Sequence, residues 1–157
     1  WGTSKTFGLA GVRVGWLTTK DKAVLQKVEN FKDYLSICSS APSEILATIA
    51  LNNLDYFLTR NLDKIQQNIA LFSKFQSKFP NLLDFAPPFT SSTAFIRLHL
   101  GISAEDFAQK LVQETGIMLL PSEAFEYGNT HARIGFGREN FPEVLAVLED
   151  FLKDNNY

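Results

Sequence analysis

The most informative part of the chain is the segment SKTFGLAGVRVGW, which occupies residues 4–16. It places Lys5 among small residues and follows it with glycines, which let a bulky ligand approach the backbone closely. Arg13 comes eight positions later and offers a planar guanidinium to an anion. Together these residues suit a cofactor with an aldehyde, which would form a Schiff base with Lys5, and a phosphate, which Arg13 would bind in bidentate fashion.

The residue types alone also leave a structural interpretation open. Lys5 would then be a surface lysine, and Arg13 would stabilise a glycine-rich turn, since short motifs are only hypotheses. This alternative does not explain why the lysine, the glycines and the arginine occur together at these offsets.

The composition of the whole chain is that of an ordinary globular protein. Its 157 residues are enough for a domain with a core, and 45% of them are hydrophobic and 20% charged. A net charge of -2 offers no basic surface to nucleic acid. The single cysteine, Cys38, excludes an internal disulfide and fits a reducing compartment such as the cytoplasm. No apolar run approaches the roughly 18 residues of a membrane span, so we expect no membrane partner.

The first half of the chain predicts a loop followed by helices. Glycines punctuate residues 1–19, and the apolar residues in 12–17 predict a strand at the end of this loop. Apolar residues at helical spacing predict a helix over 21–35, and after a serine-rich break Ser43 would cap a second helix. Residues 54–79 predict one long helix, because an apolar stripe continues without Gly or Pro until a proline ends it.

The second half predicts a small layer of strands and helices. Ser103 resembles the start of a capping box, and Pro142 marks the first turn of a last helix. Short apolar runs predict four strands, over residues 82–85, 93–100, 117–120 and 132–136. The predicted fold class is therefore α/β, with a small α/β or α+β domain at the C-terminal end. We expect three parts: residues 1–55 without a complete core, a connecting helix over 56–79, and a compact domain over 80–157.

The lysine segment resembles the cofactor-lysine motif of class I/II aminotransferases, enzymes of fold type I that use pyridoxal 5′-phosphate (PLP). The resemblance rests on a serine beside the lysine, on Gly-Leu-Ala-Gly and on Arg-Val-Gly. It continues in three later segments, at residues 38–42, 116–125 and 131–136, the last of which matches the strand with the substrate-binding arginine. Over essentially its whole length, the chain therefore resembles the C-terminal part of such an enzyme: a remnant of the large domain, the connecting helix and the small domain.

The resemblance implies a role for each matching residue. Lys5 would hold PLP as a Schiff base and, once released, would move a proton from the α-carbon of the substrate. Arg13 would bind the cofactor phosphate. Arg133 would bind the α-carboxylate of an amino acid or a 2-oxo acid through two parallel hydrogen bonds. An alternative that remains open is that Arg133 is a surface residue, with Arg138 as its nearest rival.

The chain departs from the family pattern in ways that bear on the phosphate and the substrate. Many members have a serine three residues before the lysine, where Gly2 stands, so Thr3 or Ser4 would compensate in binding the phosphate. Members that prefer dicarboxylates have a second arginine ahead of the next helix, and no arginine lies between Arg13 and Arg60. That difference argues against a dedicated aspartate or glutamate clamp of this kind.

Other reactive side chains have simpler interpretations. His99 alternates with apolar residues on a predicted strand and would face solvent, whereas His131 adjoins Arg133 and is a candidate for the site. Cys38 is expected to be a buried packing residue rather than a nucleophile. No two histidines or acids stand at the spacing of metal ligands, so no metal site is predicted.

The predicted function is amino-group transfer from an amino acid to a 2-oxo acid, by a cytoplasmic homodimer in the full-length protein. The alternatives are another PLP reaction on the same fold, such as that of a C–S lyase, a decarboxylase or a synthase, and a non-catalytic PLP or amino-acid sensor. In the family, the acidic partner of the pyridine nitrogen, the phosphate loop and the ring-stacking residue all precede the lysine. Since Trp1 is not an initiator methionine, we expect this chain to be an incomplete and inactive fragment of a longer enzyme.

Overall fold

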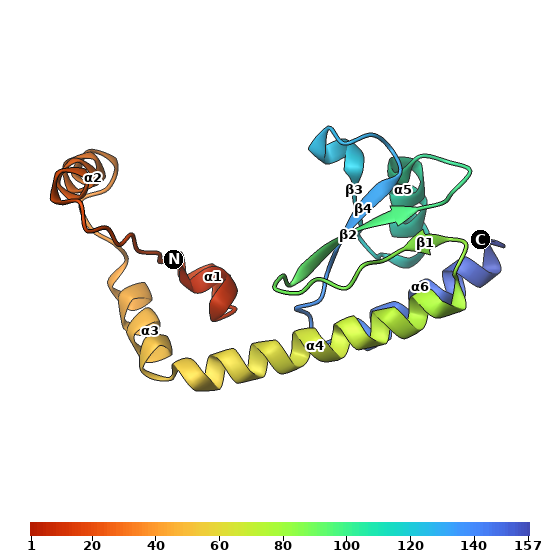
Figure 1. Ribbon diagram of the computed structural model, residues 1–157, viewed down its shortest axis with the longest axis horizontal. Coiled ribbons are helices and arrows are strands. Elements are labelled where there is room, and N and C mark those ends of the chain that lie inside the picture. The colour runs from red at the N-terminus through yellow and green to blue at the C-terminus, as the bar shows by residue number, and fades with distance from the viewer. The chain divides into compact units, whose positions relative to one another are not determined.

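The structure is a computed structural model that describes all of residues 1–157. It divides into two compact units, Trp1–Leu62 and Asp63–Tyr157. Helix α4 (Leu54–Lys78) begins in the first unit and ends in the second (Figure 1). The long helix predicted over residues 54–79 is therefore confirmed, whereas the predicted boundaries of the three parts stay a prediction.

The first unit consists of short helical segments and longer helices. Its elements are α1 (Thr3–Thr6), the 3₁₀ turn η1 (Ala10–Val12), α2 (Lys22–Leu35), α3 (Ala41–Asn52) and the first turns of α4. The buried apolar side chains come from the segment around α1 and η1 and from α3: Phe7, Val12, Ala47 and Ala50. The small core of this unit therefore lies directly under the segment that carries Lys5.

The helix starts in the first unit test the capping predictions. α2 begins close to the predicted position, because the Asp21 carboxylate accepts hydrogen bonds from the backbone N–H groups of Ala23 (2.8 Å) and Val24 (3.1 Å). α3 begins earlier than predicted: its N-cap is Ser40, and Ser43 lies inside the helix, so the predicted cap is wrong. A proline in the first turn explains the difference, since its missing N–H costs nothing there.

Two apolar stretches of the first unit lack a packing or pairing partner. The predicted stripe of α2 is present but exposed, and α2 has no buried residue. The strand predicted at the end of residues 1–19 is wrong, because only an isolated bridge joins Gly2 and Gly15. A strand needs a continuous hydrogen-bonded neighbour, and the backbone around Val14 pairs only with the first three residues of the chain.

The second unit is built on a four-stranded antiparallel sheet with the order β1-β2-β4-β3. Its strands are β1 (Leu83–Asp84), β2 (Thr93–Leu98), β3 (Leu120–Pro121) and β4 (His131–Gly135). Each overlaps one of the four predicted strands; β1, β2 and β3 are shorter than the apolar runs that predicted them, and β4 has the predicted length but begins one residue earlier. Because every pairing is antiparallel, the unit is of the α+β kind, one of the two kinds predicted.

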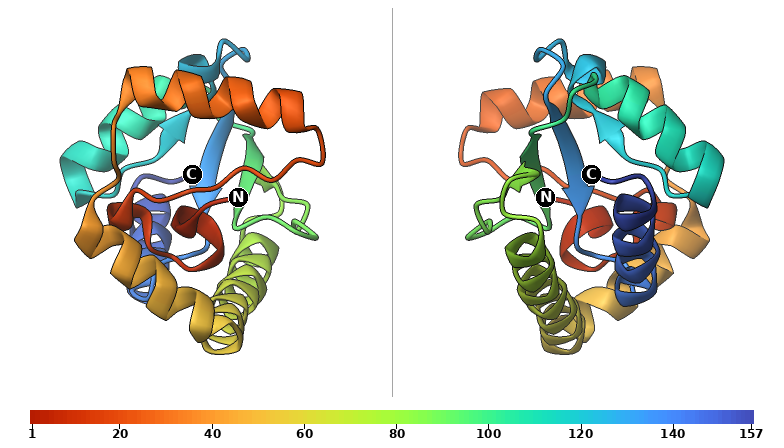
Figure 2. Two further views of the ribbon diagram at one scale, coloured as in Figure 1. Left: turned by 90° about the vertical axis from the view of Figure 1, so that its left-hand side faces the viewer. Right: turned by 90° about the vertical axis from the view of Figure 1, so that its right-hand side faces the viewer.

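Three helices cover one face of this sheet. In the right-hand view of Figure 2, α5 (Ala104–Thr115) and α6 (Phe141–Asp154) lie on the same side of β4, and α4 completes the layer. The core that they enclose is rich in phenylalanine, and Phe72 and Phe75 on the apolar stripe of α4 are 1% and 2% exposed. Its members from the helices and the strands include Phe72, Phe75, Ile96, Leu98, Phe107, Leu111, Ala132, Phe151 and Leu152.

The ends of α5 and α6 follow their local sequence. Ser103 caps α5 as predicted, because its Oγ accepts a hydrogen bond from the N–H of Asp106 at 3.0 Å. Gly116 ends the helix in the left-handed conformation, with φ 75°. α6 begins one residue before Pro142, again as predicted. No helix of the chain combines the length and the apolar character that crossing a membrane requires.

An ion-pair cluster joins the end of α4 to α6. The Glu149 carboxylate lies 2.8 Å from the Lys153 ammonium and 2.6 Å from that of Lys78. The hydrogen bonds from Lys153 and Lys78 lower the pKa of Glu149 below its ordinary value. The contribution of this group to stability is therefore present above the pKa of an unfolded glutamate and is lost as the pH falls through the lowered value.

Asn68 is the buried polar residue that ties α4 to the end of β4. Its side chain is 4% exposed, and its Nδ2 donates to the carbonyl oxygens of Phe136 (2.9 Å) and Arg138 (2.8 Å). These carbonyls follow β4 directly and have left the sheet ladder, so the amide supplies the partner that a neighbouring strand would otherwise give. The residue therefore fixes how the segment after β4 crosses α4.

Replacing Asn68 with alanine is expected to lower the free energy of unfolding of the second unit by about 2–4 kcal/mol, because two carbonyls lose their donor in a place with little access to water. The matched control is Gln67→Ala, since Gln67 is an exposed neighbour on the same helix. Denaturant unfolding of both variants measures the difference. Equal stability of the two variants would contradict the structural role of Asn68.

Candidate functional site

The segment that carries Lys5 is a closed loop. The N–H of Thr3 donates to the carbonyl of Val14 at 3.0 Å, and the N–H of Leu9 donates to the carbonyl of Thr3, also at 3.0 Å. A Cβ at Gly15 would lie 2.9 Å from the carbonyl oxygen of Trp1, so the close approach of the two ends requires glycine. Because Thr3 is bonded to Val14, the loop holds Lys5, two residues after Thr3, and Arg13, next to Val14, in one closed segment.

Thr3 and Ser4 have different surroundings, although both are candidates for binding a phosphate. Thr3 is fully buried, and its hydroxyl donates towards the carbonyls of Val14 (3.0 Å) and Leu9 (3.3 Å). It therefore braces the loop from inside. Ser4 is half-buried, and its hydroxyl makes no hydrogen bond within the chain. Of the two hydroxyls, that of Ser4 is the one left available to a ligand.

Lys5 lies in α1 and is exposed, and its amine makes no hydrogen bond or ion pair within the chain. The residues after it are anchored on α4. The ring of Phe7, 4% exposed, packs edge-on against that of Phe57 with 5.9 Å between centroids. The Asn61 Nδ2 donates to the carbonyl of Thr6 at 3.0 Å. The position of Lys5 is thus set by two contacts with a long helix.

Gly8 makes the contact with α4 possible. Its φ is +67°, and a Cβ there would lie 3.4 Å from the Asn61 side-chain amide. Any other residue would meet both the strain of the left-handed region and a close contact with Asn61. Sequence reasoning identified this glycine but gave no signal for Asn61, which reads as one polar residue among many on α4.

Arg13 has an unusual backbone conformation for a bulky residue. It is left-handed, with φ 57° and ψ 35°, directly after η1. The side chain is exposed, and one of its nitrogens, Nη1, donates to the carbonyl of Ala10 at 3.1 Å. Such outliers concentrate at functional sites. The bond to Ala10 orients the guanidinium and leaves its other N–H groups free for an anion.

Arg133 lies in β4 of the second unit, on the face of the sheet that the helices do not cover. The register pairs it with Phe95 of β2 and with Leu120 of β3. The flanking residue Ala132 is 0% exposed and points into the core, so alternation sends Arg133 outward. The guanidinium is exposed and makes no ion pair, and its Cζ lies 5.6 Å from the centroid of the Phe125 ring.

A family model described as aminotransferase class I and II matches residues 2–148. The chain belongs to the class I and II aminotransferase family. The matched residues include Lys5, Arg13 and Arg133, and the resemblance seen in the sequence is thereby confirmed.

Individual relatives from the family match nearly the whole chain. Capreomycidine synthase from Streptomyces vinaceus is 28% identical over 95% of this chain and 38% of its own length. Aspartate aminotransferase from Sulfurisphaera tokodaii is 22% identical over 96% of this chain and 39% of its own length. The crystal structure of a PLP-dependent aminotransferase from Streptococcus suis 89-1591 superposes with a TM-score of 0.89 and 30% identity, over 98% of this chain and 41% of that one. The chain thus spans about two fifths of the length of the proteins that it matches.

The exposed groups of the lysine loop fit PLP, the cofactor on which the similar Streptococcus suis aminotransferase depends. PLP carries an aldehyde and a phosphate on one ring. The loop offers a free amine on Lys5, a free hydroxyl on Ser4 and unused guanidinium N–H groups on Arg13. PLP needs an amine for its aldehyde and hydrogen-bond donors for its phosphate. The residues of this loop therefore fit PLP.

The remaining reactive side chains divide between confirmed and corrected predictions. His99 is exposed as predicted, and its Nε2 lies 2.8 Å from the Asp84 carboxylate. His131 is half-buried on the same face of the sheet as Arg133, and its place in the site stays a prediction. Cys38, expected to be buried, is exposed, because the loop between α2 and α3 crosses no core that would cover it.

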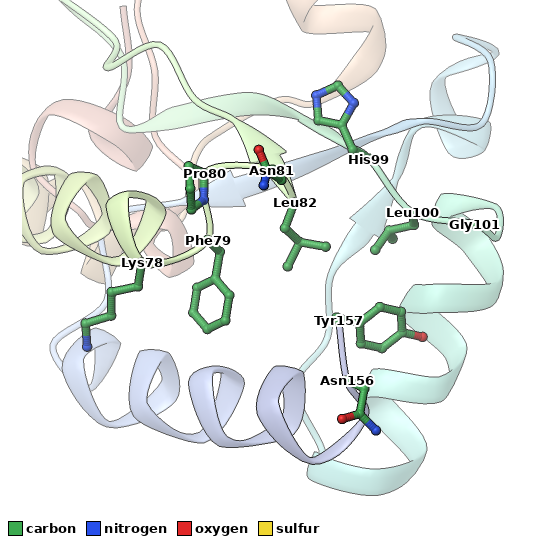
Figure 3. A pocket seen from close by; sticks show the side chains of 10 residues that line it. All are labelled: Lys78, Phe79, Pro80, Asn81, Leu82, His99, Leu100, Gly101, Asn156 and Tyr157. Carbon is green, nitrogen blue, oxygen red and sulfur yellow. The ribbon is translucent and has the colours of Figure 1, made fainter.

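A pocket of the second unit lies away from these residues. Its volume is about 490 Å³, and its lining includes Phe79, Leu82 and Tyr157 at the end of α4, the start of β1 and the C-terminal residues (Figure 3). Figure 3 shows the ring of His99 at the rim, directed away from these apolar side chains. The Lys78 ammonium is already paired with Glu149. The pocket therefore presents no free charged group to a ligand, and no predicted site residue lines it.

Proposed function

We propose that the chain is the C-terminal part of a PLP-dependent amino-acid aminotransferase, which moves an amino group from an amino acid to a 2-oxo acid. The observation that carries the proposal is the closed loop, which presents the Lys5 amine and the Arg13 guanidinium from one segment with no partner for the amine. The fold-type-I organisation with a large-domain remnant, a connecting helix and a small domain is part of the same proposal.

Each candidate site residue of the lysine loop has a defined task in this proposal. When bound, PLP supplies an aldehyde for attachment to a lysine and a ring that accepts electrons from a bond at the substrate α-carbon. Lys5 attaches the cofactor and afterwards carries the proton to and from the α-carbon as general base and acid. Arg13 binds the phosphate, with Ser4 as the supporting hydroxyl.

Arg133 binds the α-carboxylate of the substrate. Its guanidinium is exposed and has no carboxylate partner in the chain, as a binding group must be before the ligand arrives. A planar fork holds a carboxylate through two parallel bonds, and a fixed carboxylate orients the bond that is to be broken. Cation–π contact with Phe125 limits the directions that the guanidinium can take.

A synthase of the same fold is the second candidate, since capreomycidine synthase is among the proteins that this chain resembles. In this proposal Lys5 and Arg13 bind the cofactor and Arg133 binds the substrate carboxylate, and both kinds of enzyme require these contacts. They do not determine which bond of the substrate breaks. The two proposals therefore differ in the products that they predict.

The test uses the complete protein that carries these residues, loaded with PLP and mixed with single amino acids in the absence of a 2-oxo acid. An aminotransferase is expected to convert its PLP stoichiometrically to pyridoxamine 5′-phosphate, and a 2-oxo acid should then restore it. Chromatography of the released cofactor measures both steps. A new product from the amino acid, with the cofactor left as PLP throughout, would contradict transamination and favour the synthase.

A further inference from the structure

We infer that the uncovered face of the sheet beside Arg133 binds the ring of an aromatic amino acid, an inference that rests on the proposed function of Arg133. Four ring-bearing side chains gather on this face. They come from β2, from the 3₁₀ turn η2 (Ser122–Phe125) with the residues after it, and from β4: Phe95, Phe125, Tyr127 and His131.

The sheet register places these rings around the guanidinium. Phe95 is the direct cross-strand neighbour of Arg133, and Arg97 is that of His131. Directly opposed residues of an antiparallel pair have their side chains side by side on one face. The Phe125 ring completes the arrangement, with its centroid 5.6 Å from the Arg133 Cζ.

The rings hold one another in defined orientations. Phe95 stacks on the His131 ring at 5.2 Å and meets the rings of Phe125 and Tyr127 edge-on at 5.8 Å and 5.5 Å. Tyr127 also meets His131 edge-on at 5.3 Å. These are the favourable geometries of aromatic pairs. The cluster is therefore already ordered, and a ligand ring could add to it at a small cost in entropy.

Ser122 fixes the turn that carries two of these rings. It is fully buried, and its Oγ accepts a hydrogen bond from the N–H of His131 (3.1 Å) and donates to the carbonyl of Gly128 (3.1 Å). One hydroxyl thus links the start of η2, the residue after Tyr127 and the start of β4. Phe125 and Tyr127 keep their position over the sheet for that reason.

The cluster is not part of the hydrophobic core. Phe95, Phe125 and Tyr127 are 42%, 44% and 60% exposed, and the core lies on the other face of the sheet. Contiguous exposed apolar patches are typical of binding surfaces. Here it surrounds a cation without an ion-pair partner, so the ligand that complements it carries both a carboxylate and an aromatic ring.

A dicarboxylate is the competing ligand for the same face. Arg97 is exposed on this face, two residues along β2 from Phe95, and could receive a second carboxylate. Its cross-strand neighbour on the other side is Asp84, whose charge opposes that use. The rings have no role in binding a dicarboxylate, so the aromatic ligand accounts for more of the surface.

The test compares aromatic and non-aromatic ligands in the complete, PLP-loaded protein. We expect kcat/KM for phenylalanine to exceed that for alanine or aspartate by at least about tenfold, the size of one favourable aromatic contact. A readout without turnover is titration calorimetry with two unreactive probes, 3-phenylpropanoate and propanoate. The first should bind at least about tenfold more tightly.

The variants Phe95→Leu and Tyr127→Leu keep apolar bulk but remove a ring. Each is expected to reduce the preference for 3-phenylpropanoate by several-fold and to leave the binding of propanoate unchanged. Arg133→Gln should weaken both probes by at least about tenfold. The matched control is Phe89→Leu, because Phe89 is fully exposed and takes part in none of these ring contacts.

The outcomes separate this inference from the proposed function. Equal binding of the two probes, or a preference for aspartate, in an enzyme that converts PLP to pyridoxamine 5′-phosphate would overturn the aromatic site and leave transamination intact. The opposite outcome is a protein in which no amino acid converts PLP to pyridoxamine 5′-phosphate, but which binds 3-phenylpropanoate preferentially and loses that preference in Phe95→Leu. It would support the aromatic site and overturn transamination.

Discussion

Lys5→Ala is expected to lower the rate at which the complete protein converts PLP to pyridoxamine 5′-phosphate by at least about 10⁴-fold. The loss of a positioned general base alone costs roughly 10²–10⁴-fold, and the alanine variant also loses the covalent attachment of the cofactor. α1 contains no second lysine that could take its place. Single-turnover kinetics followed by chromatography of the cofactor measure the rate.

The attachment itself gives a second measurement that does not depend on turnover. Borohydride reduction of the PLP-loaded protein followed by peptide mapping should place the cofactor mass on the peptide that contains Lys5. The matched control is Lys20→Ala, since Lys20 is an exposed lysine in the loop before α2. Cofactor mass on another lysine, or a Lys5→Ala variant that keeps the wild-type rate, would show that the lysine segment has been misread.

The elements of this fold were predictable where local sequence and burial agree. The apolar stripe of α4 predicted its helix to within a residue, and Ser103 predicted the start of α5, because capping and periodicity act within a few residues. The stretch after Val12 was mistaken for a strand. Its alternation of apolar residues satisfies the pattern, but strand formation depends on a neighbour that is remote in sequence.

Burial in the first unit was the least predictable property. Cys38 and the apolar stripe of α2 have the composition of packed positions, yet they are exposed. Sequence patterns indicate which face of an element is apolar, but not whether another element lies against it. The predicted cap at Ser43 was wrong for a more local reason, since the proline before Ser43 already occupies the first turn of α3.

The candidate site was predictable for the residues that belong to a contiguous motif. Lys5 and Arg13 lie eight positions apart within one glycine-rich loop. By contrast, Phe95, Phe125 and Tyr127 come together only through the register of β2 with β4 and the turn after β3. One signal was available in advance: Phe95 lies on the polar side of an alternating strand, between Thr93 and Arg97. A single large apolar residue at a solvent-facing position is common, so only the clustering of several rings in the folded sheet marks the surface.

Phe72→Ala is expected to reduce the free energy of unfolding of the second unit by about 3–5 kcal/mol, the usual cost of removing a buried phenylalanine. Phe72 is 1% exposed at the centre of the core, with the rings of Phe75, Phe85 and Phe136 at 5.5, 4.8 and 5.9 Å. Alanine would leave a cavity between α4 and the sheet. Hydrogen exchange of the β2 amides in the complete protein reports this loss directly, because those amides open with the core.

The same substitution tests how the core supports the proposed site. Strands β2 and β4 carry Phe95 and Arg133 on one face and core residues on the other, so the packing under them sets the distance between ring and guanidinium. Phe72→Ala should therefore lower the fraction of folded protein and raise the KM of the molecules that remain folded. Phe89→Ala, at a fully exposed phenylalanine, should change neither quantity. A loss of less than about 1 kcal/mol at Phe72 would mean that the helices do not hold the sheet in place.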